Sequence, residues 1–224
     1  MHNPALGPIA FQFGTRPLLT QESPISAEWK ARLLTLNPGD VLLHAFSPTG
    51  FYSSAVKNSF LEELCQRSER QIGYMIDSVG AHDTCLMVGP RGRPVYVTYP
   101  DYQSAQQWQE QGYTTALRTP SSTLIFVTPK KSEEIHQDQV SCMGCLSACL
   151  FSNWSQETGS TGHKADPRSF CIQKTLQDIS HGGCTDQNLM FAGHNVYRFS
   201  KDPFYAGGFI PTVAQLMAHM CTGA

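Results

Sequence analysis

The chain has 224 residues, of which 41% are hydrophobic and 15% charged, and its formal net charge is −2. This length is sufficient for one sizeable core, or one core with a small appendage, and the composition is that of an ordinary globular protein. The near-neutral charge excludes an electrostatic case for binding nucleic acid or an anionic membrane. No apolar run approaches the ~20 residues of a membrane span.

The first residues, 1–4, lack the basic and apolar regions of a secretory signal peptide. We therefore expect a cytoplasmic protein. In that compartment the eight cysteines are expected to be thiols or metal ligands, because disulfide frameworks belong to oxidising environments.

The apolar run at residues 9–13 predicts a strand that ends in a turn at Gly14 and Thr15. Glycine lets the backbone approach an anion, and the amides of such a turn can donate to a phosphate. Arg16 would add a positive charge. The alternative is an ordinary strand followed by a turn.

Helical and extended patterns alternate over the next fifty residues. Ser26 is a good N-cap for a helix over 27–34. Trp29, Leu33 and Leu34 fall on one face at helical spacing, which also predicts this helix. A buried strand is expected over 41–46, followed by a loop whose hydroxyl and aromatic residues are also typical of ligand pockets. A further helix begins at Phe60 and would place Cys65 in its core.

The middle of the chain predicts two strands joined by a turn-rich loop, then an exposed helix, a further strand and a hydrophilic connector. The ranges are 85–88 and 95–99 for the paired strands, 104–111 for the helix, 124–127 for the strand and 130–139 for the connector. The histidines in this half of the chain lie in polar surroundings and are expected at the surface: His82, His136 and His163.

The chemistry-bearing stretch is a C-x-x-C-x-x-x-C run, followed later by a fourth cysteine. Its members are Cys142, Cys145, Cys149 and Cys171. Thiolates at this spacing can converge on one soft centre, which predicts an iron–sulfur cluster or a zinc site with Cys171 as fourth ligand. Two alternatives stay open: small buried residues in a tight turn, or a disulfide within the C-x-x-C.

Three elements are expected after this run. Asp166 would cap a helix over 166–176, which places Cys171 early in the helix, where the dipole favours a thiolate. A strand over 188–195 would present His194 and Asn195 just past Gly193, at the kind of strand end where α/β enzymes keep polar groups. The last helix is expected over 211–220.

Several of these segments carry a resemblance to a known family. Residues 11–16 resemble the last barrel strand of the nitronate monooxygenase family, the 2-nitropropane dioxygenase-like flavin enzymes, and three later stretches look like the C-terminal region of its longer members: 142–149, 170–172 and 189–198. In that family FMN lies on a (β/α)8 barrel and the glycine-threonine segment closes on its phosphate. The resemblance thus implies FMN-phosphate contacts by Gln12, Phe13, Gly14 and Thr15.

The resemblance also implies the fold class: α/β, the C-terminal part of a (β/α)8 TIM barrel with an appended α/β region. The expected regions are 1–80 for the last barrel strand and its helices, 81–135 for an α/β insertion and 136–224 for the cysteine-containing part. The family's earlier strands and its catalytic histidine would precede residue 1, so no catalytic residue is assigned. The chain would need the missing barrel half or a homo-oligomeric partner.

The cysteine run also resembles the cluster-binding segment of iron–sulfur flavoenzymes of the old yellow enzyme type, such as 2,4-dienoyl-CoA reductase, in which the fourth cysteine comes sooner. Two functions follow. The first is the C-terminal portion of an FMN-dependent nitronate monooxygenase that oxidises alkyl nitronates with O2 and is inactive as this isolated chain. The second is a metal- or iron–sulfur-binding α/β module without flavin chemistry of its own.

Overall fold

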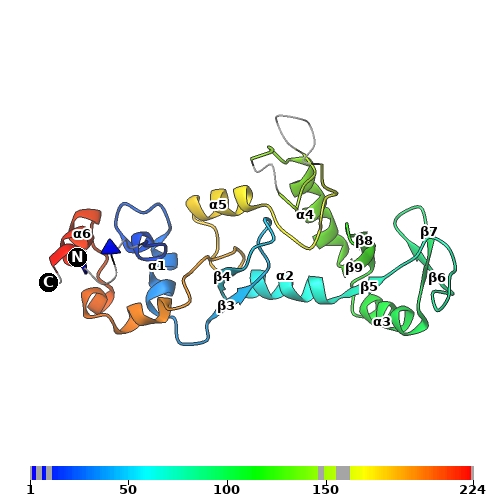
Figure 1. Ribbon diagram of the computed structural model, residues 1–224, viewed down its shortest axis with the longest axis horizontal. Helices are drawn as coiled ribbons and strands as arrows, with labels where there is room; N and C mark the ends of the chain where they lie inside the picture. Colours follow the sequence, from blue (N-terminus) through cyan, green and yellow to red (C-terminus); the bar gives the residue numbers. More distant parts are fainter. Residues whose placement is uncertain (1, 4–6, 9–11, 146–148, 155–161, 223–224) are drawn as a thin grey trace. The chain divides into compact units, whose positions relative to one another are not determined.

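The computed structural model describes residues 2–3, 7–8, 12–145, 149–154 and 162–222 (Figure 1). The fold is mixed α/β, built from helices and small sheets, which confirms the expected α/β class. The strands that the structure describes form no closed barrel. Within these same ranges, no helix combines the length and the apolar character that crossing a membrane requires.

The chain divides into two compact units that interleave along the sequence. The first unit contains residues 1–43, 54–58 and 178–224, and the second contains 44–53 and 59–177. The boundaries expected after residues 80 and 135 both lie within the second unit.

The first unit is organised around helix α1 (Ala27–Leu34), which was predicted with its cap. The Ser26 hydroxyl accepts a hydrogen bond from the Trp29 amide at 3.3 Å. Trp29 is buried, and its indole Nε1 donates to the Gly183 carbonyl at 3.0 Å, which ties the helix to the C-terminal segment. Fully buried Leu33 lies on the same face.

The other elements of the first unit are short. The 3₁₀ helices are η1 (Arg16–Leu19), η2 (Val196–Lys201) and η3 (Pro203–Gly208), and the unit also holds α6 (Val213–Thr222) and the antiparallel pair β1 (His2–Asn3) and β2 (Gly7–Pro8). The predicted last helix is thus confirmed as α6. Its Cys221 is exposed.

Two predicted strands of the first unit are corrected. Gln12 and Phe13 lie in no strand, while residues 9–11 fall outside the described ranges. The segment 188–195 joins no sheet: it makes only an isolated bridge from Phe191 to Ala55, and His194 and Asn195 are exposed.

The strand predicted as buried over 41–46 is β3 (Val41–His44), which pairs with β4 (Ser53–Val56) and is only partly buried.

The second unit is built on an antiparallel sheet of three strands in the order β5-β9-β8. Its strands are β5 (Gln71–Gly73), β9 (Thr123–Val127) and β8 (Thr115–Arg118). The central strand β9 is almost wholly buried, as its run of four apolar residues predicts. Helix α2 (Ser59–Glu69) contacts β9. The predicted strand pair is confirmed as a hairpin, β6 (Thr84–Val88) and β7 (Arg93–Val97).

Two helices of the second unit use the same start signal, a threonine cap followed by proline in the first turn. Helix α3 (Tyr99–Glu110) is capped by Thr98, and helix α4 (Pro129–Val140) by Thr128, whose hydroxyl accepts from the Lys131 amide at 3.2 Å. Proline suits this position because the first helical amides have no partner within the helix. The expectation of a hydrophilic connector over 130–139 was therefore wrong. This segment is a helix, and its only buried residue is Ile135.

Helix α5 (Ile172–Ser180) begins six residues later than predicted. Asp166 does not cap it. Its carboxylate instead holds the Arg168 guanidinium through contacts of 2.7–3.2 Å, while Arg168 also donates to the Gln71 side chain at 3.0 Å. The cap position falls to Cys171, whose carbonyl accepts from the Thr175 amide at 3.1 Å.

Candidate functional site: a cavity lined by four cysteines

A cavity of about 200 Å³ in the second unit is lined by all four cysteines that the sequence singles out: Cys142, Cys145, Cys149 and Cys171. The end of α4 and the start of α5 form its sides. An ion pair of 3.0 Å between Asp138 on α4 and Lys174 on α5 joins the two helices beside it.

Cys142 and Cys145 occupy the turn that follows α4. Gly144 has a φ of +65°, a conformation that favours glycine, and its amide donates to the Cys142 sulfur at 3.4 Å. The Cys142 thiol lies 3.9 Å from the Trp154 carbonyl, to which it donates. Cys145 is exposed. The backbone of this turn thus presents both sulfurs near the cavity mouth.

Cys149 is the buried member of the set. It packs with Ile135 and Phe151 in a small apolar cluster, and Cys171 contacts the same cluster. The Gln139 side chain donates to the Phe151 carbonyl at 3.0 Å, which fastens this segment to α4. The cavity therefore borders a small apolar cluster, and its thiols come from three separate parts of the chain.

Cys171 lies at the start of α5, as predicted in outline. The backbone amides of Gln173 and Lys174 hydrogen-bond to its sulfur, which favours the thiolate. Burial has the larger, opposite effect and raises the pKa of the Cys171 thiol, and nearby Asp138 raises it further. The helix start thus favours the thiolate as expected, but burial outweighs this effect.

The neighbouring sulfurs affect the pKa of the Cys145 thiol. Partial burial raises the pKa of its thiol, and the neighbouring Cys149 and Cys142 raise it as well. Like charges at close range disfavour simultaneous ionisation. A bound cation would reverse this effect, because metal binding releases the thiol protons and compensates the negative charge.

Within the described ranges, no three side chains of His, Cys, Asp or Glu lie in an arrangement that could hold one metal ion. All eight cysteines are free thiols, so the C-x-x-C disulfide is not formed. Residues 146–148, between Cys145 and Cys149, lie outside the described ranges. The soft donor set suits iron–sulfur or zinc chemistry, and ligation would require the sulfurs to move into such an arrangement.

The predicted phosphate segment lies in the first unit. Gln12, Phe13 and Gly14 are exposed, and a Cβ added at Gly14 would meet no atom within 4 Å, so the backbone there is open to a ligand. The Thr15 hydroxyl accepts a hydrogen bond from the Gly193 amide at 2.8 Å. Arg16, expected to add a positive charge, forms a 2.7 Å ion pair with Asp202.

Sequence reasoning missed the charged pair beside the cysteines. Asp138 and Lys174 stand on α4 and α5, and the first of these helices was read as a connector. The signal that would have found it was the Thr128-Pro129 start, followed by residues with good helix propensity.

Comparison of the chain with family models, curated proteins and solved structures returned no match.

Proposed function

We propose that this chain is the C-terminal part of an FMN-dependent oxidoreductase of the nitronate monooxygenase type, and that its cysteine cavity holds an iron–sulfur cluster or a zinc ion. The observation that carries the proposal is that Cys142, Cys145, Cys149 and Cys171 line one cavity, although 29 positions separate the first from the last. If these cysteines served only as small packing residues, there would be no reason for all four to line the same cavity.

A second observation supports the flavin part of the proposal. Two of the segments that carry the family resemblance, residues 11–16 and 189–198, are joined by the hydrogen bond from the Gly193 amide to Thr15. The open backbone at Gly14 would receive the FMN phosphate, with Gln12, Phe13 and Thr15 beside it. FMN, when bound, would take electrons from an alkyl nitronate and pass them to O2. The missing part of the barrel would supply the catalytic histidine.

The cysteine set would act in one of two ways. An iron–sulfur cluster would add a one-electron carrier to the flavin protein, whereas zinc would act as a structural link between the end of α4 and the start of α5. Both require thiols that stay reduced, which supports a location in the cytoplasm as part of this proposal.

The second candidate function is a metal- or cluster-binding module without flavin chemistry. It is favoured by the ion pair between Arg16 and Asp202, because the positive charge expected to face a phosphate is then partly compensated within the chain itself. Titration of FMN into the protein, followed by flavin fluorescence, separates the two. Weak binding that becomes stoichiometric with an added N-terminal barrel half supports the oxidoreductase, whereas no binding in either case supports the module.

The metal proposal is tested by anaerobic purification followed by iron, zinc and sulfide analysis. We expect iron with near-equal sulfide and absorbance near 400 nm, or one zinc per chain, and loss of either in Cys149→Ser. The control variants are Cys65→Ser and Cys221→Ser, because neither residue lines the cavity. Metal-free protein after anaerobic preparation, or equal loss in the controls, would contradict the proposal.

A further inference from the structure

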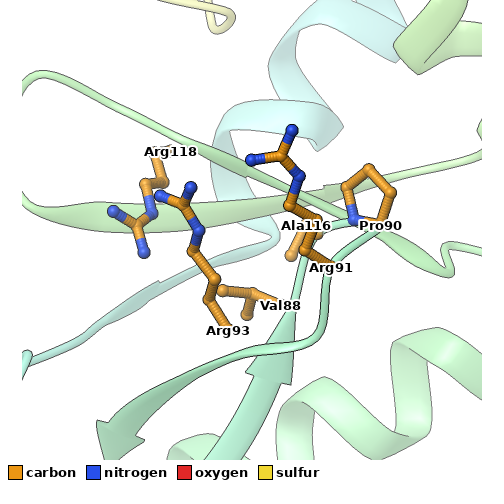
Figure 2. A pocket seen from close by; sticks show the side chains of 7 residues that line it. Val88, Pro90, Arg91, Arg93, Ala116 and Arg118 are labelled. Carbon is orange, nitrogen blue, oxygen red and sulfur yellow. The ribbon is translucent and has the colours of Figure 1, made fainter.

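A second cavity, of about 360 Å³, lies at the turn of the β6–β7 hairpin and is lined by three arginines (Figure 2). Arg91 and Arg93 come from the hairpin and Arg118 comes from β8. The remaining lining residues are apolar or glycine, and no acidic residue is among them: Val88, Gly89, Pro90 and Ala116. In Figure 2 the guanidinium group of Arg93 extends toward that of Arg118.

The strand registers explain why two of these arginines reach one cavity. Arg93 pairs with Val88 across the hairpin and shares a face of β7 with fully buried Val95. On β8, Arg118 lies two residues beyond Ala116, which packs against the same apolar cluster as Val95. Each arginine therefore stands at the end of a row of core-facing positions, where a further apolar side chain would otherwise extend the core.

The arginines are positioned by their local structure. The Gly92 amide donates to the Gly89 carbonyl at 3.0 Å and closes a tight turn, in which Arg91 lies; both glycines have positive φ, +73° and +56°. The Arg118 guanidinium stands 5.3 Å from the centre of the Tyr74 ring, a cation–π distance. Among the residues that the structure describes, none of the three arginines forms an ion pair with a carboxylate.

Three uncompensated positive charges around one cavity repel each other, by about 1 kcal/mol for a pair 4 Å apart in water. The chain as a whole is slightly acidic, so this concentration does not reflect a generally basic surface. An anion in the cavity would remove the repulsion. The planar guanidinium fork matches two phosphate oxygens at once, and several such forks match a pyrophosphate group better than a single carboxylate.

We propose that this arginine cavity binds a small ligand that carries a pyrophosphate group. The phosphates would lie against Arg91, Arg93 and Arg118, and an apolar body would lie on Val88, Pro90 and Ala116. The cavity volume is in the range of small-molecule sites. A nucleoside diphosphate and inorganic pyrophosphate share this chemistry and differ in that only the nucleotide has a body for the apolar wall. The site does not depend on the cysteine cavity or on flavin.

The test is calorimetric titration of the full chain with ADP, with inorganic pyrophosphate and, separately, with a single-stranded oligonucleotide. We expect saturable 1:1 binding of pyrophosphate, and at least tenfold weaker binding in both Arg93→Gln and Arg118→Gln. The matched control is Arg32→Gln, which removes the same charge from an exposed position on α1. Arg91→Gln, on the exposed turn, serves as a variant that leaves the sheet intact.

The ligand arms give distinct results. Tighter binding of ADP than of pyrophosphate assigns the apolar wall to a nucleoside, and equal binding assigns the site to the pyrophosphate alone; both support the proposal. Equal losses in the cavity variants and in Arg32→Gln would show unspecific charge attraction and overturn it. So would absence of binding to both small ligands, or binding of the oligonucleotide alone.

Discussion

Asp138 and Lys174 form an ion pair of 3.0 Å that joins helix α4 to helix α5 beside the cysteine cavity. Asp138 also raises the pKa of the Cys171 thiol, because a nearby negative charge disfavours the thiolate. The same carboxylate thus joins the helix that carries Cys171 to α4 and adds to the larger effect of burial, which raises the pKa of this thiol.

Removal of this carboxylate should activate Cys171. In Asp138→Asn the pKa of the Cys171 thiol falls, so the thiolate is more populated at pH 8 and iodoacetamide alkylates Cys171 several-fold faster. Peptide-resolved mass spectrometry measures the rate. The control is Glu133→Gln, an exposed acidic residue on the same helix. An unchanged rate in Asp138→Asn would show that the Asp138 charge does not act on this thiol.

The metal-free protein should lose stability in alkaline solution. Burial raises the pKa of Cys145 and of Cys171, so the folded chain binds their protons more tightly than the unfolded chain does. This contribution is fully present below the ordinary thiol pKa of about 8.5 and is lost as the pH rises through the higher folded values. Thermal melting in reductant between pH 7 and pH 10.5 measures the loss. Replacing both cysteines with serine should reduce the loss, and Cys85→Ser should not. A smaller pH dependence should remain, because burial also raises the pKa of Cys65 and of Tyr205.

Thr15→Val should weaken the first unit. The substitution removes the acceptor of the Gly193 amide and leaves a side chain of similar shape. We expect a decrease of about 0.5–1 kcal/mol in the free energy of unfolding, the net value of one partly exposed hydrogen bond. Thr15→Ser retains the hydroxyl and should restore most of the loss. A loss in Thr15→Ser as large as that in Thr15→Val, measured by urea denaturation, would contradict this assignment, because the serine variant keeps the hydroxyl acceptor.

Trp29 should be the most sensitive position of the first unit. It is 3% exposed, and its indole donates to the Gly183 carbonyl. Trp29→Ala should cost about 3–5 kcal/mol through the cavity it leaves. Trp29→Phe keeps much of the ring and loses the hydrogen bond, so its cost should be about 1–2 kcal/mol. Urea denaturation followed by circular dichroism gives both values, and a Phe variant as unstable as the Ala variant would contradict this division.

The sequence predicted those elements whose signals are local. The cap at Ser26, the buried run of β9 and the cysteine spacing each depend on a few adjacent residues, and the structure bears out α1 and β9 and brings the four cysteines to one cavity. Helix α4 was missed because its composition is hydrophilic and only Ile135 is buried, so the chain shows almost no apolar period there. Asp166 was read as a cap, although its side chain is engaged by Arg168 two residues on. Arg168 also donates to Gln71, 97 positions away, a contact that no local pattern reveals.

The interleaving of the two units constrains how the protein is made. The second unit is complete once residue 177 has been synthesised, whereas the first needs residues 178–224. Until then Trp29 lacks Gly183, and Val56 lacks the Met190 carbonyl, to which its amide donates at 2.8 Å. Domains generally fold in the order in which they leave the ribosome. Here the parts of the first unit that come early in the sequence, 1–43 and 54–58, should stay unfolded until residues 178–224 have been synthesised.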